Sequence, residues 1–253
     1  MRQPEPALLD RLADRGWPAL EREQLGGWTL RAAGGVTNRA NSVLTSGVVP
    51  EVESAVDRAE RWYHERGLPA VFQVSPASPP ALAAELGRRG YREHSRTDIL
   101  VADREEVAAT APAAEVSVAA APPAGWLDAW WAVDGRGGDA ERDIAGRILS
   151  GGPALYAWAS AADATPIAVA RLALVDDWAG LYAVATLPEA RRRGLARALA
   201  VALANEAGGR GVRRLWLQVL ADNAAAHALY AGLGFRPASH YAYWTERSTV
   251  PAA

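Results

Sequence analysis

The chain has 253 residues, of which 50% are hydrophobic and 22% charged, so it is long enough for one large or two small globular domains. Its 27 basic and 29 acidic residues nearly balance, which does not favour a nucleic-acid partner. All 27 basic residues are arginine and cysteine is absent, which excludes disulfides, thiolate nucleophiles, Schiff-base lysines and lysine-containing phosphate loops.

The first half of the chain predicts strands and helices in alternation. Pro50 opens a helix with a hydrophobic face at Val52, Val56, Ala59 and Tyr63. We expect, in chain order, a short helix before Gly26, strands at 28–33 and 40–46, a helix from Pro50 to Gly67, a strand at 70–74, a helix at 80–89 and a strand at 97–101. Residues 103–113, rich in Ala, Glu and Pro, are predicted to be a linker.

The second half predicts a similar alternation. Leu195, Leu199 and Leu203 recur at spacing four, as on the buried face of a helix. We expect strands at 116–118, 155–159, 167–175, 178–186, 213–219 and 241–245, with helices near 125–133, 140–149, 194–206 and 223–233. Strands alternating with helices predict an α/β (α+β) fold, in which a sheet is flanked by helices.

An internal repeat relates the two halves. The segments 66–68, 72–74 and 90–92 resemble 210–212, 217–219 and 234–236, each at a separation of 144 or 145 residues and in the same order. The second copy has extra residues around Arg191–Gly194. We therefore predict a duplication, with domains at 1–102 and 114–253 joined by the linker at 103–113.

One candidate site follows the strand at 178–186, in the sequence from Thr186 to Ala196. The first turn of a helix leaves N–H groups unpaired, and the helix dipole favours an anion there. Gly194 lacks a Cβ, so a pyrophosphate could approach the backbone closely, and Arg191–Arg193 would add cationic donors. The alternative interpretation is an exposed, arginine-rich start of a helix.

A second candidate segment begins at Asn223, at the predicted start of a helix. Tyr230 lies seven residues later, about two helical turns on, and therefore projects from the same face. Asn223 could bind a ligand amide or simply cap the helix, and Tyr230 could be a half-buried core residue. The sequence alone leaves these alternatives open.

Together, these two segments resemble the GNAT superfamily of acetyltransferases. Arg191, Gly194 and Ala196 match its R/Q-x-x-G-x-G/A loop. Its N-x-x-A-x-x-L-Y-x-x-x-G-F segment is matched by Asn223, Ala226, Leu229, Tyr230, Gly234 and Phe235. The resemblance covers residues 114–245, and the sequences of these segments are most similar to those of ribosomal-protein alanine N-acetyltransferases.

The resemblance implies two GNAT-like mixed β-sheet lobes, the second a complete acetyl-CoA-binding fold. It implies that backbone groups of Val184, Ala185 and Thr186 pair with the pantetheine arm of acetyl-CoA. The pyrophosphate would be bound by Arg191, Arg192, Arg193, Gly194, Leu195, Ala196 and Arg197. Asn223 would bind an amide of the cofactor, and Tyr230 would be the general acid that protonates the departing thiolate.

The sequence departs from the alanine acetyltransferases at Gln218, where they have a catalytic Glu. An amide cannot act as a base, so another group must deprotonate the amine or the amine must arrive neutral. Glu189 and Tyr182 are candidates by position only. The first copy lacks the arginine–glycine loop and has Leu86 in the place of Tyr230, so we expect one acetyl-CoA site per chain.

The leading hypothesis is acetyl transfer from acetyl-CoA to a primary amine, either a small molecule or a protein N-terminus. The alternatives are a non-catalytic acyl-CoA-binding regulatory module and a nucleotide-binding protein that uses the same loop. Trp126, Trp130 and Trp131 could line an acceptor site, although a core role is the simpler interpretation. The polar run Thr37–Ser42 has no assigned chemistry. A monomer and a homodimer both remain open.

Three further predictions concern environment. The four histidines have no metal-ligand spacing, so we expect no metal site. No apolar run approaches the ~20 residues that cross a bilayer, so we expect no membrane partner. The polar first ten residues lack a signal-peptide core, which favours a cytoplasmic location.

Overall fold

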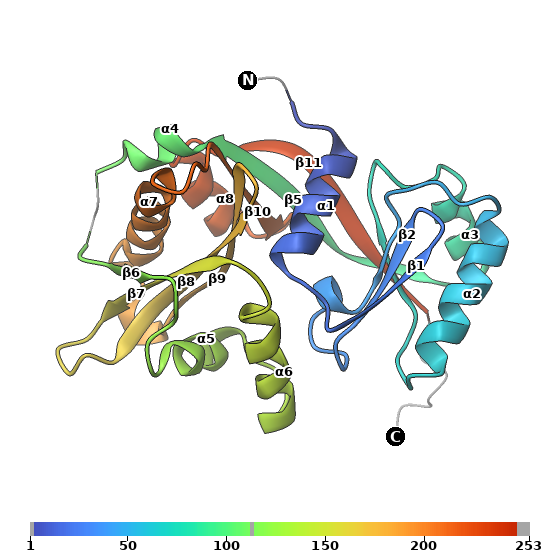
Figure 1. Ribbon diagram of the computed structural model, residues 1–253, viewed down its shortest axis with the longest axis horizontal. Helices are drawn as coiled ribbons and strands as arrows, with labels where there is room; N and C mark the ends of the chain where they lie inside the picture. The colour runs from blue at the N-terminus through green and yellow to red at the C-terminus, as the bar shows by residue number, and fades with distance from the viewer. Residues whose placement is uncertain (1–2, 112–113, 247–253) are drawn as a thin grey trace. The chain divides into compact units, whose positions relative to one another are not determined.

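The computed structural model describes residues 3–111 and 114–246 (Figure 1). The contacts within the chain divide it into two compact units, Met1–Asp98 with Ala238–Ala253, and Ile99–Pro237. This division departs from the boundaries expected from the sequence, because the end of the chain returns to the first unit. The outermost positions of the two expected domains, 1–2 and 247–253, and positions 112–113 of the expected linker lie outside the described residues.

The first unit is a small mixed sheet with helices. Its elements are α1 (Pro6–Gly16), β1 (Glu21–Leu25), β2 (Trp28–Ala32), η1 (Asn38–Ala40), β3 (Val43–Leu44), α2 (Val52–His64), β4 (Val71–Val74), α3 (Leu82–Arg88), the start of β5 (Arg92–Asp103) and most of β11 (Arg236–Thr245). β1, β2 and β3 pair antiparallel, β3 pairs parallel with β4, and β4 pairs antiparallel with β11. The α2 helix forms the connection that a parallel pair requires.

β1 was not expected from the sequence. Its residues Glu21–Gln24 are exposed and only Leu25 is buried, so the segment lacks the alternation that identifies a half-buried strand. The strand expected at 40–46 is reduced to Val43–Leu44, because Asn38–Ala40 forms a 3₁₀ turn. The other expected strands and helices of this unit are confirmed, although β5 begins at Arg92 and is longer than the strand expected at 97–101.

Asn41 accounts for much of the polar run between β2 and β3. Its Oδ1 accepts hydrogen bonds from the backbone N–H groups of Ala33 at 2.7 Å and Gly35 at 2.8 Å. Its Nδ2 donates to the carbonyls of Val36 at 2.7 Å and Thr37 at 2.8 Å. The side chain thus satisfies four backbone groups of the connection, and it is itself buried.

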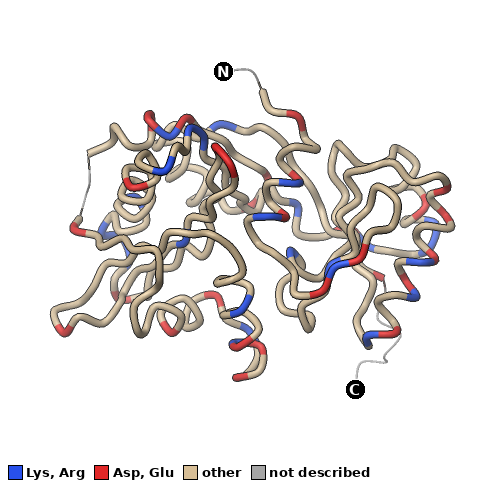
Figure 2. Tube along the Cα trace, in the orientation of Figure 1, with Lys and Arg blue, Asp and Glu red and all other residues tan. Residues whose placement is uncertain are grey.

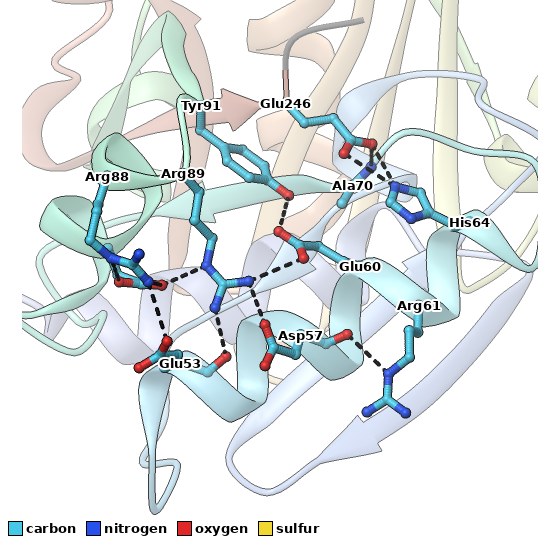
Figure 3. Close-up of polar contacts among 11 residues, drawn as sticks. Glu53, Asp57, Glu60, Arg61, His64, Ala70, Arg88, Arg89, Tyr91 and Glu246 are labelled. Carbon is cyan, nitrogen blue, oxygen red and sulfur yellow. Dashed lines mark hydrogen bonds and ion pairs between the residues drawn. The ribbon is translucent and has the colours of Figure 1, made fainter. Parts of the chain in front are cut away.

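An ion-pair network joins α2 to the end of α3. Both acidic and basic residues lie along α2 (Figure 2). Arg89 reaches the carboxylates of Asp57 at 2.5 Å, Glu60 at 3.1 Å and Glu85 at 2.5 Å, and Figure 3 shows it pointing toward α2. The hydroxyl of Tyr91 donates to Glu60 at 3.0 Å. These contacts fix α3 on the apolar core that lies beneath α2.

The sheet face beside α1 carries a buried polar network instead. The guanidinium of Arg31 is 2% exposed and contacts Asp14 at 3.3 Å, the carbonyl of Ser42 at 2.9 Å and Oε1 of Gln73 at 2.8 Å. Asp14 also forms a two-bond ion pair with Arg22. Buried charges are costly unless they are paired, and here each group has polar partners.

The second unit contains the larger mixed sheet. Its elements are the end of β5, α4 (Arg104–Ala108), β6 (Ser117–Ala119), α5 (Trp126–Asp134), α6 (Asp139–Leu149), β7 (Ala154–Ser160), β8 (Pro166–Val175), β9 (Trp178–Thr186), η2 (Pro188–Ala190), α7 (Leu195–Gly208), β10 (Arg214–Leu220) and α8 (Ala224–Ala231). The strand order is β5-β10-β9-β8-β7-β6, in which β6–β9 pair antiparallel and β9 pairs parallel with β10. This confirms the expected α/β class.

Helices cover both faces of this sheet. On one face, α7 packs over an apolar core that includes Leu155, Leu217 and Val219. On the other, the indole N–H of Trp126 in α5 donates to the carbonyl of Ala157 at 3.0 Å. Part of the expected linker is also structured, because α4 packs against α7 and its Val107 is fully buried.

The two units share one pattern of strands. In each, antiparallel strands lead into a strand, a helix and a further strand that pairs parallel, with α2 and α7 in equivalent places. This agreement supports the predicted duplication. The last strand of each half, however, ends in the other unit. β5 runs from residue 92 to 103 across the boundary at 98, and β11 crosses back at 237.

Candidate active site

The turn between β9 and α7 exposes a row of backbone amides. Arg192 and Gly194 both have left-handed backbone conformations, with φ of 63° and 74°. The first backbone bond of the helix is from the N–H of Ala198 to the carbonyl of Gly194. Among the described residues, the amides of Leu195, Ala196 and Arg197 have no backbone acceptor. This geometry suits an anion that approaches the helix start.

Cationic side chains surround this turn. Arg191, Arg192 and Arg193 are exposed, whereas Leu195 is buried and anchors the helix start in the core. Arg191 donates from Nε to the carbonyl of Thr186 at 3.3 Å, and Arg197 to that of Gly232 at 3.4 Å. The remaining guanidinium groups can serve as charge-assisted donors to a phosphate.

β9 and β10 separate beside this turn. Their parallel register ends at the pair Leu181 and Leu217, although β9 continues to Thr186 and β10 to Leu220. A β-bulge lies in the β8–β9 pairing, and Ala183 there has a φ of 50°. A bulge bends its strand, which explains why β9 leaves β10 at this point.

Val184, Ala185 and Thr186 lie in this separated segment. Ala185 and Thr186 pair with Val169 and Ala168 of β8. In the strand order of the described residues, only β10 lies on the other side of β9, and its register with β9 has already ended. The free edge of β9 can therefore accept an extended ligand as an added strand.

Asn223 caps the start of α8, and Tyr230 lies in its last turn. The Oδ1 of Asn223 caps the helix by accepting from the N–H of Ala226 at 3.0 Å, and this leaves its Nδ2 group for other partners. Tyr230 is 8% exposed, packs edge-on against Phe235 at 5.7 Å, and belongs to the same core cluster as Leu195. No hydrogen bond joins its hydroxyl to another described residue. Burial raises the pKa of Tyr230 to about 12, so the phenol stays protonated at neutral pH.

The opposite sheet face presents a different set of groups. The indole N–H of Trp216 donates to the hydroxyl of Tyr182 at 3.1 Å, in a buried contact between β10 and β9. Gln218 lies two residues after Trp216 and so projects from the same face. Its Oε1 is buried and has no hydrogen-bond partner among the described residues. No pattern in the sequence predicted either feature.

The remaining candidate residues lie in the core or on the surface, in places that suit a structural role. Trp126 and Trp130 are 1% and 4% exposed, in agreement with the core interpretation. Glu189 lies on the exposed 3₁₀ turn that precedes the arginines. Across residues 3–111 and 114–246, no three His, Asp or Glu side chains gather as a metal site would require. The helices within those ranges are all too short or too polar to span a bilayer.

Comparison with known proteins identifies the family. The family model described as "Probable histone acetyltransferase Rv0428c C-terminal" matches residues 7–244. The "Uncharacterized N-acetyltransferase YobR" of Bacillus subtilis (strain 168) is 30% identical over 243 residues, which cover 94% of this chain and 98% of that protein. The chain belongs to the GNAT family of N-acetyltransferases.

Other members of the GNAT family extend this result. The "Probable histone acetyltransferase Rv0428c" of Mycobacterium tuberculosis is 28% identical over 246 residues, which cover 95% of this chain and 74% of that protein. The alanine N-acetyltransferase of ribosomal protein bS18 from Escherichia coli (strain K12) is 50% identical over only 66 residues, which are 26% of this chain and 45% of that enzyme.

Solved structures agree with this family's fold. A GCN5-related N-acetyltransferase from Kribbella flavida has a TM-score of 0.72 at 19% identity and covers 96% of both chains. A tandem GNAT protein from the clavulanic acid biosynthesis pathway has a TM-score of 0.69 at 16% identity, covering 100% of this chain and 92% of that one. At these identities the likeness concerns the fold alone, and it agrees with a chain of two GNAT-like halves.

Proposed function

We propose that the second unit transfers the acetyl group of acetyl-CoA to a primary amine. The observation that carries this proposal is the separation of β9 and β10 beside the unpaired amides that begin α7. The free edge of β9 at Val184, Ala185 and Thr186 would hold the pantetheine arm. The amides and arginines from Arg191 to Arg197 would hold the pyrophosphate, and the Nδ2 of Asn223 would donate to a carbonyl of the arm.

The chemistry is a direct transfer. The amine nitrogen attacks the thioester carbonyl, so that the C–N bond forms as the C–S bond breaks. Tyr230 donates its phenolic proton to the departing sulfur and regains a proton released from the nitrogen. A pKa of about 12, caused by burial, keeps this proton in place near neutral pH. The products are an amide and the free thiol of CoA.

The first unit lacks the equivalent machinery, so we propose one acetyl-CoA site per chain. The first turn of α2 carries the acidic Glu53 where α7 has unpaired amides beside arginines, and a carboxylate there would repel a phosphate. Leu86, in the place of Tyr230, is fully buried and has no proton to donate.

The test is a screen of the full chain with acetyl-CoA and a panel of primary amines. The panel contains free amino acids, polyamines, aminoglycosides and peptides with free N-termini, and release of the CoA thiol is measured. We expect thermal stabilisation by CoA, about 2.7 kcal/mol at a hundredfold excess over its Kd, and thiol release with at least one amine class. Stabilisation without any thiol release would favour an acyl-CoA-binding regulatory module. A preference for ATP over CoA would favour a nucleotide-binding protein.

The cytoplasmic location stays a prediction.

A further inference from the structure

The unpartnered oxygen of Gln218 is unusual for a buried group. Buried amide oxygens almost always accept a hydrogen bond, because leaving one unpaired costs roughly 1–3 kcal/mol. Oε1 of Gln218 is buried and has no donor among the described residues. An oxygen that is held without a protein donor can receive one from a ligand.

The equivalent glutamine of the first unit, Gln73, has a hydrogen-bond donor for its side-chain oxygen, unlike Gln218. Gln73 on β4 corresponds to Gln218 on β10 in the internal repeat, and both strands pair parallel with the strand before them. Oε1 of Gln73 accepts from Arg31 at 2.8 Å. The first unit thus satisfies its glutamine oxygen from within the protein and leaves only the Nε2 of Gln73 without a partner among the described residues, whereas the second unit leaves the oxygen itself unpaired.

Gln218 also lies at the point where the sheet opens. It is the first residue of β10 beyond Leu217, where the register with β9 ends. Leu217 and Val219 belong to the core on the α7 side, so Gln218 projects to the side of Trp216. Tyr230 lies in the α7-side core. Gln218 and Tyr230 therefore lie on opposite faces of the sheet.

We propose that Oε1 of Gln218 accepts a hydrogen bond from the nitrogen of the acceptor amine, which enters on the Trp216 face of the sheet. This inference rests on the acetyl-transfer function proposed above. The amide orients the nitrogen toward the thioester carbonyl, while Tyr230 serves the sulfur from the other face. An amide takes no proton, so the acceptor reacts as the neutral amine and the rate follows its own ionisation.

The experiment uses the amine from the panel that gives the fastest turnover, and compares wild type with Gln218→Met and Gln218→Glu. Methionine keeps the length of the side chain without a comparable acceptor, so the KM for the amine should rise about tenfold, the value of one hydrogen bond. The Kd for CoA should stay within twofold of wild type. Glutamate keeps an oxygen and adds a base, so the KM should stay low and the acid limb of the pH–rate profile should move to lower pH.

Gln73→Met is the matched control. It removes the equivalent glutamine from the first unit, where the oxygen is bonded to Arg31, so it should lower the thermal midpoint without changing the KM for the amine. An unchanged KM and pH profile in both Gln218 variants would overturn the inference while leaving acetyl transfer standing. If Gln218→Met does not fold, the pH profile of Gln218→Glu decides alone. Absence of turnover by wild type on the whole panel would instead overturn the proposed function and this inference with it.

Discussion

Trp216 donates its indole N–H to the hydroxyl of Tyr182 across 3.1 Å, and this bond joins β10 to β9 beside the last pair of their register. Their rings meet edge-on, with centroids 6.2 Å apart. The contact closes the sheet on one side of the point where the strands separate. It therefore fixes where the opening begins.

Tyr182→Phe removes the acceptor of this bond and leaves the buried indole N–H of Trp216 unpaired. We expect a loss of about 1–3 kcal/mol in unfolding free energy, measured by urea denaturation. The same variant tests Tyr182 as a base. If the hydroxyl only closes the sheet, kcat should fall by less than about tenfold, and a loss of a hundredfold or more would assign it a direct role in proton transfer.

Gly194→Val tests the turn that begins α7. At a φ of 74° a β-branched side chain is strained, and its Cβ would stand where an anion approaches the amides. We expect a loss of about 1–2 kcal/mol in stability, together with at least about tenfold weaker binding of CoA by calorimetry. The tenfold figure, about 1.4 kcal/mol, is the low end of the value of one charge-assisted hydrogen bond.

Gly211→Val is the matched control for that variant. Gly211 has a φ of 76°, and a Cβ there would meet nothing within 4 Å. The backbone strain is the same, but the position lies after α7, away from the unpaired amides. Similar losses of stability, with CoA binding weakened only in Gly194→Val, are the expected result. Equal effects on CoA binding would show that strain alone explains them.

Asp10 predicts a pH-dependent stability in the first unit. Burial raises the pKa of this carboxyl to about 6, against the hydrogen bond from Ser75 that lowers it. Its folded pKa exceeds its unfolded pKa, so the protonated form stabilises the fold at low pH. That contribution, about 3 kcal/mol, is lost as the pH rises from about 4 through 6.

The measurement is urea denaturation of wild type and Asp10→Asn at pH 4.5 and 7.5. The variant should lack most of the loss of stability between these values, because asparagine does not titrate. Asp163→Asn, which removes an exposed carboxylate, is the control and should behave as wild type does. Asp14 does not interfere: burial raises its pKa, but Arg31 and Arg22 outweigh this and hold it below the ordinary value, outside the window. Parallel pH responses in wild type and Asp10→Asn would refute the assignment.

The sequence predicted the candidate turn better than the opening beside it. Arg191–Gly194 and Tyr230 stand out because a phosphate turn and a helix face each depend on a few local residues. The separation of β9 from β10 depends on a bulge at Ala183, and alanine gives no sign that it will adopt a φ of 50°. Whether the oxygen of Gln218 has a hydrogen-bond donor depends on residues that are distant in the sequence and close in space. No local sequence pattern therefore reveals that it is unpaired.

In the fold, too, some features follow from local sequence and others do not. Helices such as α2 and strands such as β9 follow from periodicity, but β1 lacks an apolar alternation because Glu21–Gln24 all face solvent. The sequence also did not predict that β5 and β11 each cross from one unit into the other. A strand's own residues specify that it is a strand, whereas its partner is chosen by contacts more than a hundred residues away in the sequence.

The raised pKa of the Tyr230 phenol predicts the pH–rate profile of acetyl transfer. With the pKa of Tyr230 raised to about 12 by burial, its protonated form persists through the alkaline range. The rate should rise as the acceptor amine loses its proton and should then stay level to about pH 11. A descending limb near pH 10, the ordinary range of tyrosine, would mean that this hydroxyl is not desolvated as the structure has it.

The most direct test of the proposed function is the turnover of Tyr230→Phe, with CoA binding measured on the same preparation. Phenylalanine keeps the ring that packs on Phe235 and removes only the hydroxyl, which has no partner among the described residues. We predict that kcat falls by about a hundredfold or more while the Kd for CoA stays within twofold. A kcat equal to that of wild type, with CoA still bound, would contradict the role of Tyr230 as the acid that releases the thiol.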